Sequence, residues 1–434
     1  MPQQDAQPFP SPPRPHARDV GSAASGSATR LEHSLLKALH RLAGDPPLNL
    51  LLWDGFAAGP ANARFAIEIL DRAALLQLLR SPTISFGELF SAGRLRVHGD
   101  LSDMLVEIYR HLERARRTWP AWLRRLWRDR ARRGANLADA RHNIHRHYDL
   151  GNDFYRQWLD RAAMQYTCAY FETPDISLEQ AQLAKLEHVC RKLRLQPGQQ
   201  VIEAGCGWGG LARYMAQQHG VRVRAFNISR EQLAWAREQA DREGLADRVE
   251  FIEDDYRNIT GDCDAFVSIG MLEHVGPDNY PALAGVIGRT LKADGIGLIH
   301  TIGRNRPGPV NAWIEKRIFP GGYVPSIGEL MGLFEDGGLS VLDVENLRLH
   351  YAQTLEHWQQ RYLAVLDRVR ADYDDDFARA WALYLAGSRA AFIAGNMQLF
   401  QVVFAPAGSN QVPHSRLHLY RSPAAPPDTA LARS

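Results

Sequence analysis

The sequence is poor in cysteine and lacks any long apolar run. Its four cysteines show no C-x-x-C spacing, so we expect no disulfide framework, no metal site and a reducing compartment. No apolar run approaches the ~20 residues of a membrane-spanning helix, and the first residues lack the apolar core of a secretory signal. The protein is therefore expected in the cytoplasm or at the surface of a membrane.

Charge of one sign is also scarce. The 434 residues carry a formal net charge of only +2, which gives no reason to expect a nucleic acid as partner. One local exception is the segment 119–146, which places Trp119, Trp122 and Trp127 among many arginines. Such a segment suits anionic lipid headgroups, but similar segments also pack at domain junctions, and the pattern alone leaves both interpretations open.

Composition and apolar spacing suggest two domains with flanking tails. Residues 1–30 and most of 406–434 are rich in Pro, Ser, Gly and Ala, and we expect them to be disordered. The run RLHLY at 416–420 could add a short strand. Residues 31–118 have the mixed spacing of a small α+β domain, in which 64–80 changes from a strand pattern to a helix pattern. The segment 119–146 then joins this domain to a larger one over 147–405.

Within the larger domain, strand patterns alternate with helix patterns. The expected strands are 199–204, 221–228, 248–255, 263–270 and 296–303, and the expected helices are 211–220, 229–244 and 281–295. This alternation predicts an α/β fold with a mainly parallel, doubly wound sheet that helices cover on both faces, as in Rossmann-like proteins. Ser229 and Gln232 also have the spacing of a capping box at the start of the second helix.

A glycine-rich loop, Glu203-Ala-Gly205-Cys-Gly207-Trp-Gly209-Gly210, joins the first of these strands to the first helix. It matches the G-x-G-x-x-G pattern of dinucleotide sites, but the second strand ends at Asn227 without the acidic residue that a ribose 2′-hydroxyl requires. Glu203 before the spaced glycines instead favours S-adenosylmethionine, with Asp255 and Tyr256 after the third strand as candidates for the adenine. A tight strand-to-helix turn is the simpler alternative.

Several longer runs resemble one protein family. HYDLGNDFYRQWLD, QYTCAYF, VIEAGCGWGGLARYMA, IGMLEHVGPDNY, LIHTIG and QLFQVVF are similar to segments of the cyclopropane-fatty-acyl-phospholipid synthases, which are related to the mycolic acid cyclopropane synthases. The resemblance spans roughly 147–404 in the right order. It implies a Rossmann-like methyltransferase domain behind a smaller N-terminal α+β domain, and it suggests a homodimer.

The resemblance also implies a reaction and a site. A methyl group passes from S-adenosylmethionine to the double bond of an unsaturated phospholipid acyl chain, and a bound bicarbonate removes a proton from the resulting carbocation. The implied bicarbonate site consists of Cys168, Glu273, His300, Ile302 and Tyr351, in which histidine, tyrosine and backbone N–H groups donate and Glu273 accepts the ion's hydroxyl hydrogen. Contacts to S-adenosylmethionine are expected from Tyr166, Glu203, Gly205, Gly207, Asn227, Gln232, Asp255 and Tyr256.

Two of these positions depart from the family pattern, and three other functions remain open. Asn227 stands where many members have threonine and Glu203 where many have aspartate, although both keep a hydrogen-bonding group. The alternatives are an enzyme that makes methyl-branched chains, a small-molecule N-methyltransferase, and a lipid-binding protein without catalysis. A synthase acting on phospholipid is expected in the cytoplasm, peripheral at the inner face of the membrane.

Overall fold

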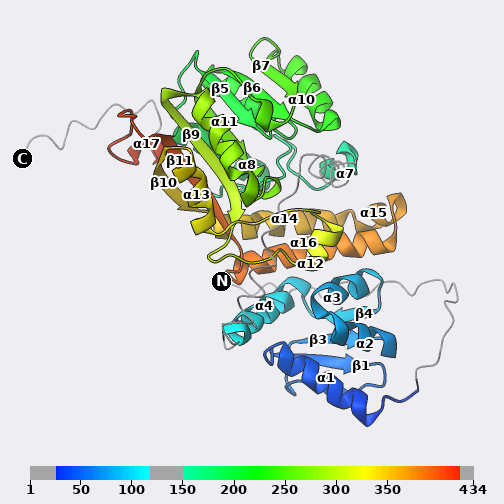
Figure 1. The fold of residues 1–434 in the computed structure, drawn as a ribbon. Helices are drawn as coiled ribbons and strands as arrows, with labels where there is room; N and C mark the ends of the chain where they lie inside the picture. The colour runs from blue at the N-terminus through cyan, green and yellow to red at the C-terminus, as the bar shows by residue number, and fades with distance from the viewer. Residues whose placement is uncertain (1–25, 118–149, 421–434) are drawn as a thin grey trace, which may run out of the picture. The chain divides into compact units, whose positions relative to one another are not determined.

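The computed structural model describes residues 26–117 and 150–420, which form two compact units (Figure 1). One unit contains the described residues up to Leu159 together with 303–326 and 348–398, and the other contains 160–302, 327–347 and 399–420. The basic segment 119–146 lies outside the described residues. None of the helices within the described ranges is long and apolar enough to cross a membrane.

The first unit is built around a small sheet with the strand order β2-β1-β3-β4. Its strands are β1 (Leu48–Leu52), β2 (Ala57–Ala58), β3 (Phe65–Ile69) and β4 (Leu95–His98), and the surrounding helices are α1 (Arg30–Leu42), α2 (Arg72–Arg80), α3 (Pro82–Ser91) and α4 (Leu101–Arg117). Every second residue of β1 and β3 is buried, which gives this sheet one apolar face. The change from strand to helix predicted within 64–80 is confirmed, because Asp71 caps α2 directly after β3.

Helices from later in the sequence complete this unit. They are α7 (Asn152–Arg156), α12 (Ala312–Arg317), α14 (Arg348–Ala364), α15 (Leu366–Asp372) and α16 (Asp375–Ile393), of which α14 and α16 lie side by side (Figure 1). The ring of Phe154 lies 4.9 Å from that of Trp381, and the indole of Trp313 covers Gly87 on α3. The contact between Trp313 and Gly87 joins residues from the two sides of the segment 119–146.

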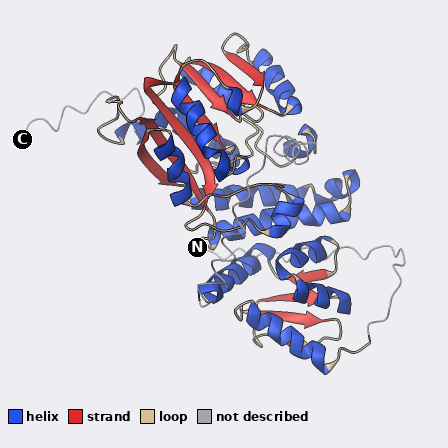
Figure 2. Ribbon diagram, in the orientation of Figure 1, coloured by secondary structure: helices blue, strands red, loops and turns tan. Residues whose placement is uncertain are grey.

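The second unit contains a seven-stranded sheet with the order β10-β11-β9-β8-β5-β6-β7. Figure 2 shows its strands in red with blue helices around them. Its strands are β5 (Gln200–Ala204), β6 (Arg222–Asn227), β7 (Val249–Glu253), β8 (Cys263–Ile269), β9 (Leu291–Gly303), β10 (Leu339–Asn346) and β11 (Gln398–Pro406). The strands β5 to β9 pair in parallel, whereas β10 and β11 pair antiparallel. The prediction of a mainly parallel sheet is confirmed.

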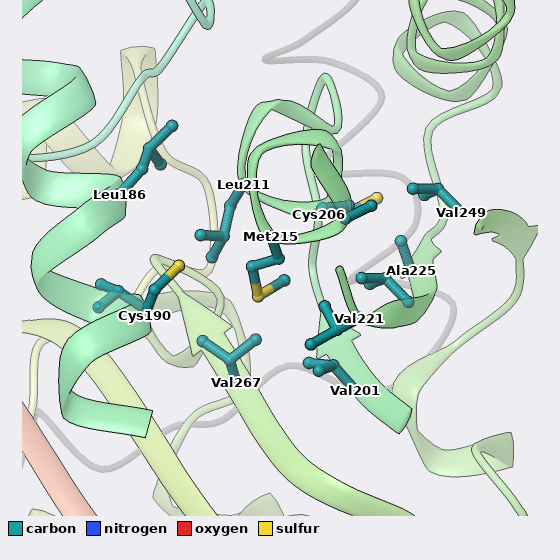
Figure 3. Packing of buried hydrophobic residues seen from close by; sticks show 14 of the residues in the cluster. Leu186, Cys190, Val201, Cys206, Leu211, Met215, Val221, Ala225, Val249 and Val267 are labelled. Carbon is teal, nitrogen blue, oxygen red and sulfur yellow. The ribbon is translucent and has the colours of Figure 1, made fainter. Parts of the chain in front are cut away.

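Helices cover both faces of this sheet, as predicted. Val201 packs with residues of α8 (Leu178–Leu193), α9 (Gly210–His219) and α10 (Arg230–Arg242), as part of the apolar cluster in Figure 3. The next residue, Ile202, points to the opposite face and packs with α11 (Tyr280–Thr290) and α13 (Ile327–Asp336). Alternate residues of one buried strand therefore contribute to two separate cores.

The structure corrects the sequence interpretation at three places. Helix α11 ends at Thr290, and residues 291–295, predicted as its last turn, begin β9, where Leu291 pairs with Cys263. Ser229 caps α10, but the side chain of Gln232 bonds to Asn227 instead of completing a capping box. A short helix, α17 (Leu417–Tyr420), forms where the run 416–420 was expected to add a short strand; it packs on α8, and its apolar Leu419 is buried.

Candidate active site

Most of the predicted site residues gather at the carboxyl ends of the parallel strands. The glycine loop follows β5, Asn227 ends β6, Asp255 follows β7, and Glu273 lies in the short helix η2 (Leu272–His274) after β8. Loops at this edge of an open parallel sheet are the usual place for a ligand. The fold therefore brings together residues that are far apart in the sequence.

The glycine loop has a left-handed backbone at Gly205, Gly207 and Gly209, with φ values of +82°, +53° and +73°. A side chain at Gly205 would lie 2.9 Å from Cβ of Met271, and one at Gly209 would lie 2.5 Å from the ring of Phe251, so both positions require glycine for packing. A Cβ atom at Gly207 would meet nothing within 4 Å among the described residues. Gly207 thus leaves open space in which a ligand can lie against the backbone.

Asn227 ties this loop to the start of α10. Its Nδ2 donates to the carbonyl oxygen of Gly207 at 3.2 Å and to Oε1 of Gln232 at 2.8 Å. Its Oδ1 accepts hydrogen bonds from the amides of Ile228 and Ser229, which fixes the orientation of the side chain. The structure therefore places three of the predicted cofactor residues, Gly207, Asn227 and Gln232, in direct contact.

The residues after β7 lie beside this group. The amide of Asp254 donates to the carbonyl oxygen of Asn227 at 3.1 Å. Asp255 is buried and caps the short helix η1 (Tyr256–Asn258) by accepting from the amide of Arg257 at 3.0 Å. The hydroxyl of Tyr256 is buried without a hydrogen-bond partner in the described part of the chain, and burial raises the pKa of this phenol.

Glu203 lies near the end of β5, directly before the glycine loop. Its side chain is only 2 % exposed, and its carboxylate accepts a hydrogen bond from the backbone amide of Ala212 in the first turn of α9. Burial raises the pKa of Glu203 to about 8, although nearby Lys185 and Arg213 act in the opposite direction. Its second oxygen, Oε2, has no hydrogen-bond partner among the residues described.

The segment from Asp160 to Cys168 carries two further predicted residues, Tyr166 and Cys168. Asp160 fixes its start by accepting hydrogen bonds from the amides of Ala163 and Gln165, each at 2.7 Å. A Cβ atom at Gly210 would lie 2.4 Å from the carbonyl oxygen of Ala163, so this segment crosses the N-terminus of α9 in close contact. Tyr166, later in this segment, is half-buried.

Sequence reasoning missed Lys185, which binds the segment from Asp160 to Cys168 through hydrogen bonds. This lysine is fully buried on α8, and its ammonium donates to Oε1 of Gln165 and to Oγ1 of Thr167. Burial lowers the pKa of Lys185 to about 8. A signal was available in the sequence, because Gln182, Lys185, His188 and Lys192 recur at helical spacing on a helix face that is otherwise apolar.

Glu273 and His300 each present one buried polar atom without a partner. Oε1 of Glu273 accepts from the amide of Ile302 at 2.7 Å, whereas its Oε2 has no partner within the described ranges. Burial raises the pKa of Glu273 to about 7. His300 is 2 % exposed, its Nδ1 contacts Gln401, and its Nε2 lacks a described partner. Burial lowers the pKa of His300 well below its usual range, so the imidazole is neutral.

The other two members of the predicted bicarbonate set differ in their surroundings. Cys168 lies in the same compact unit as Glu273 and His300 and is fully buried there. Its thiol donates to the carbonyl oxygen of Ala169 at 3.1 Å. Tyr351 belongs to the other compact unit, where its ring packs 4.6 Å from Phe392 and 6.0 Å from Trp358. Its place in the set rests on the family resemblance. The described residues contain no group of His, Cys, Asp and Glu that could hold a metal ion.

Comparison with known sequences shows that the chain is similar to lipid-modifying enzymes. A family model described as mycolic acid cyclopropane synthetase matches residues 135–402. The chain is 35% identical over 393 residues to a probable fatty acid methyltransferase of Pseudomonas putida, a match that covers 86% of this chain and 96% of that protein. It is 43% identical over 265 residues to the cyclopropane-fatty-acyl-phospholipid synthase of Escherichia coli strain K12, covering 61% of this chain and 68% of that protein.

A solved structure of a related enzyme has a similar fold. The crystal structure of the mycolic acid cyclopropane synthase CmaA1 complexed with SAH and CTAB superimposes with a TM-score of 0.58 and 30% sequence identity. The match covers 61% of this chain and 97% of that one. This likeness confirms the α/β fold class predicted for the larger part of the chain.

The two hydrogen bonds that Asp160 accepts should stabilise the start of the segment from Asp160 to Cys168. In Asp160→Asn, one carboxylate oxygen becomes an NH₂ group that faces a backbone N–H, so we expect a loss of about 1–3 kcal/mol in the free energy of unfolding. Hydrogen exchange should accelerate at the amides of Ala163 and Gln165. Asp153→Asn is the matched control, because the side chain of Asp153 is 89% exposed. Equal effects of the two substitutions on stability would contradict this role for Asp160.

Proposed function

The chain belongs to the mycolic acid cyclopropane synthetase family, and from that premise we propose that it is an S-adenosylmethionine-dependent cyclopropane-fatty-acyl-phospholipid synthase. The proposed reaction adds a methylene unit to the double bond of an unsaturated acyl chain. The observation that carries the proposal is the pair of buried, unpartnered atoms Glu273 Oε2 and His300 Nε2. They lie after β8 and within β9, neighbouring strands joined by a hydrogen bond from Gly270 to His300 of 2.9 Å.

The glycine loop fits S-adenosylmethionine. Gly207 offers open space against the backbone, and the end of β6 carries Asn227 where a dinucleotide site would need a carboxylate. The cofactor would be held by Gly205, Gly207, Asn227, Gln232, Glu203, Tyr166, Asp255 and Tyr256. When bound, S-adenosylmethionine supplies an electrophilic methyl group. The name of one relative, a probable fatty acid methyltransferase, supports a cofactor that donates a methyl group.

Glu273 and His300 together fit a bicarbonate ion. Neutral His300 offers an N–H donor to a carbonate oxygen, and the free oxygen of Glu273 accepts the hydrogen of the ion's hydroxyl group. The amide of Ile302 holds the Glu273 carboxylate in place. Cys168 and Tyr351 are included in the proposed set on the family resemblance alone. Held in this way, the ion would take a proton from the newly added methyl group as the ring closes.

Burial at these residues also suits the reactive intermediate. A carbocation on the acyl chain reacts with water to give an alcohol, so the enzyme must keep water away from it. Cys168 is fully buried and His300 nearly so, so bulk solvent has little access to these side chains. The residues of the site therefore bind the ion and exclude solvent at the same time.

We further propose that the enzyme works at the inner face of the membrane, where its phospholipid substrate lies. The proposal rests on the basic, tryptophan-bearing segment 119–146, whose residues suit an anionic headgroup layer. We also propose a homodimer, on the basis of the resemblance to the cyclopropane-fatty-acyl-phospholipid synthases.

A second candidate is an enzyme that makes a methyl-branched chain from the same intermediate. The relative from Pseudomonas putida, a probable fatty acid methyltransferase, favours it, since that match covers 96% of the relative. The two functions share the cofactor and the carbocation intermediate, which gives a methyl-branched chain when it loses a different proton or is reduced. Product analysis distinguishes them.

The direct test incubates the purified protein with S-adenosylmethionine and vesicles of a monounsaturated phospholipid. We expect the released acyl chains to gain one carbon and two hydrogens in mass spectrometry and to show high-field ring protons in NMR. The same mass gain with an alkene signal retained would instead establish methyl branching. An unchanged acyl chain would contradict both functions and would favour an N-methyltransferase or a lipid-binding protein without catalysis.

Glu273→Gln tests the proton acceptor site. The amide cannot accept the ion's hydroxyl hydrogen as a carboxylate does, so we expect turnover to fall about 100-fold or more with nearly unchanged affinity for S-adenosylmethionine. Because burial raises the pKa of Glu273 to about 7, the carboxylate predominates only above that pH. Wild-type turnover should therefore decrease as the pH falls through about 7, and this dependence should disappear in the variant.

The matched control for this substitution is Glu250→Gln on β7, whose side chain is 68% exposed. It should leave turnover and its pH dependence as in the wild type. If Glu273→Gln had no more effect than this control, Glu273 would not belong to the bicarbonate site.

A further inference from the structure

A chain of buried polar side chains extends from His300 into the protein. Nδ1 of His300 lies 3.1 Å from Nε2 of Gln401 on β11, and Oε1 of Gln401 accepts from Nζ of Lys192 on α8 at 2.7 Å. The same ammonium donates to Oε2 of Glu345 on β10 at 2.5 Å, and this oxygen also lies 2.8 Å from Nε2 of His188. Gln401 and Lys192 are 0% and 2% exposed.

The chemistry of these groups fixes the direction of the hydrogen bonds. An ammonium group can only donate, so the oxygen of the Gln401 amide must face Lys192 and its NH₂ group must face His300. Nδ1 of His300 is then an acceptor and carries no proton. Because the buried imidazole is neutral, its one proton resides on Nε2, the atom that has no partner in the described structure.

The charge of Lys192 is balanced behind this contact. Burial disfavours the ionised carboxylate of Glu345, but the hydrogen bond from His188 and the charge of Lys192 outweigh it and lower the pKa of Glu345 to about 2. An ionised Glu345 allows the lysine to stay buried and charged, which a lone ammonium could not do. The ring of Tyr170 stacks on His188 with 4.2 Å between the ring centroids. His188 is the last member of this series of hydrogen-bonded side chains.

We propose that Lys192 and Gln401 are positioning residues that hold His300 as the Nε2–H tautomer, with Glu345 as the counterion of the lysine. The inference rests on the proposed function, since the bicarbonate ion is the group that this N–H would bind. The nearby ammonium groups of Lys185 and Lys192 also disfavour a protonated imidazole. His300 therefore donates a hydrogen bond without protonating the ion, which keeps the ion able to accept a proton.

NMR of protein labelled with ¹⁵N in its histidines tests the tautomer directly, without cofactor or substrate. The two ring nitrogens of His300 are assigned from the signals that disappear in His300→Gln. We expect Nε2 to be protonated and Nδ1 unprotonated in the wild type. In Gln401→Glu, the new carboxylate accepts from both Lys192 and His300, so the proton should move to Nδ1.

Gln217→Glu is the matched control, because it makes the same chemical change at an exposed position of α9. It should leave the His300 signals unchanged. If Gln401→Glu fails to fold, Lys192→Met serves instead: without the ammonium the Gln401 amide is free to turn over, and both tautomers of His300 should be seen. A wild-type His300 protonated at Nδ1, or one unaffected in these variants, would overturn the proposal.

The NMR result and the product assay can fail independently. If the tautomer responds as expected but no modified acyl chain forms, the positioning of His300 stands and the proposed function is wrong. If the cyclopropane product forms but the tautomer does not depend on Gln401, the positioning role alone is wrong. In an active enzyme, Gln401→Glu should lower turnover about tenfold or more with nearly unchanged affinity for S-adenosylmethionine.

Discussion

The burial of ionisable groups along helix α8 constrains the rest of the site. Lys185 and Lys192 point from this helix into the protein and are almost without solvent exposure, so each needs partners at fixed positions. Lys185 finds them in the segment that carries Tyr166 and Cys168, and Lys192 finds them in Gln401 and Glu345. One helix thereby sets the positions of the segment before it in the sequence and of the two antiparallel strands.

The same constraint explains which atoms are left for chemistry. Asn227 and Asp160 each have partners that hold their side chains. Glu273 Oε2 and His300 Nε2, like Glu203 Oε2 and the hydroxyl of Tyr256, are buried without a partner among the described residues. Glu273 and His300 present an acceptor and a donor, and the other polar atom of each side chain is already fixed. Such a pair costs stability unless a ligand satisfies it. A small ion that both accepts and donates hydrogen bonds meets both requirements.

Local patterns predicted the parallel sheet and part of the site. Apolar spacing predicts the strands β5 to β8, and the spaced glycines predict the loop after β5. Both are local signals, because each can be read from residues that are close together in the sequence. The end of α11 was predicted wrongly because residues 291–295 carry a helix-compatible pattern, and only pairing with β8 makes them a strand. Lys192 and Gln401 were missed because they are 209 residues apart, and no local spacing indicates that contact. Tyr351 and Ile302 were chosen by resemblance to the family.

The open space at Gly207 is the proposed binding place of S-adenosylmethionine. Calorimetric titration with S-adenosylhomocysteine tests it in Gly207→Ala and in Gly244→Ala, an exposed glycine with a similar positive φ and equally open surroundings. Both substitutions should cost about 1–2 kcal/mol of stability through backbone strain. Only Gly207→Ala should weaken binding, by about tenfold or more. Equal binding by the two variants, or no binding by the wild type, would contradict the account.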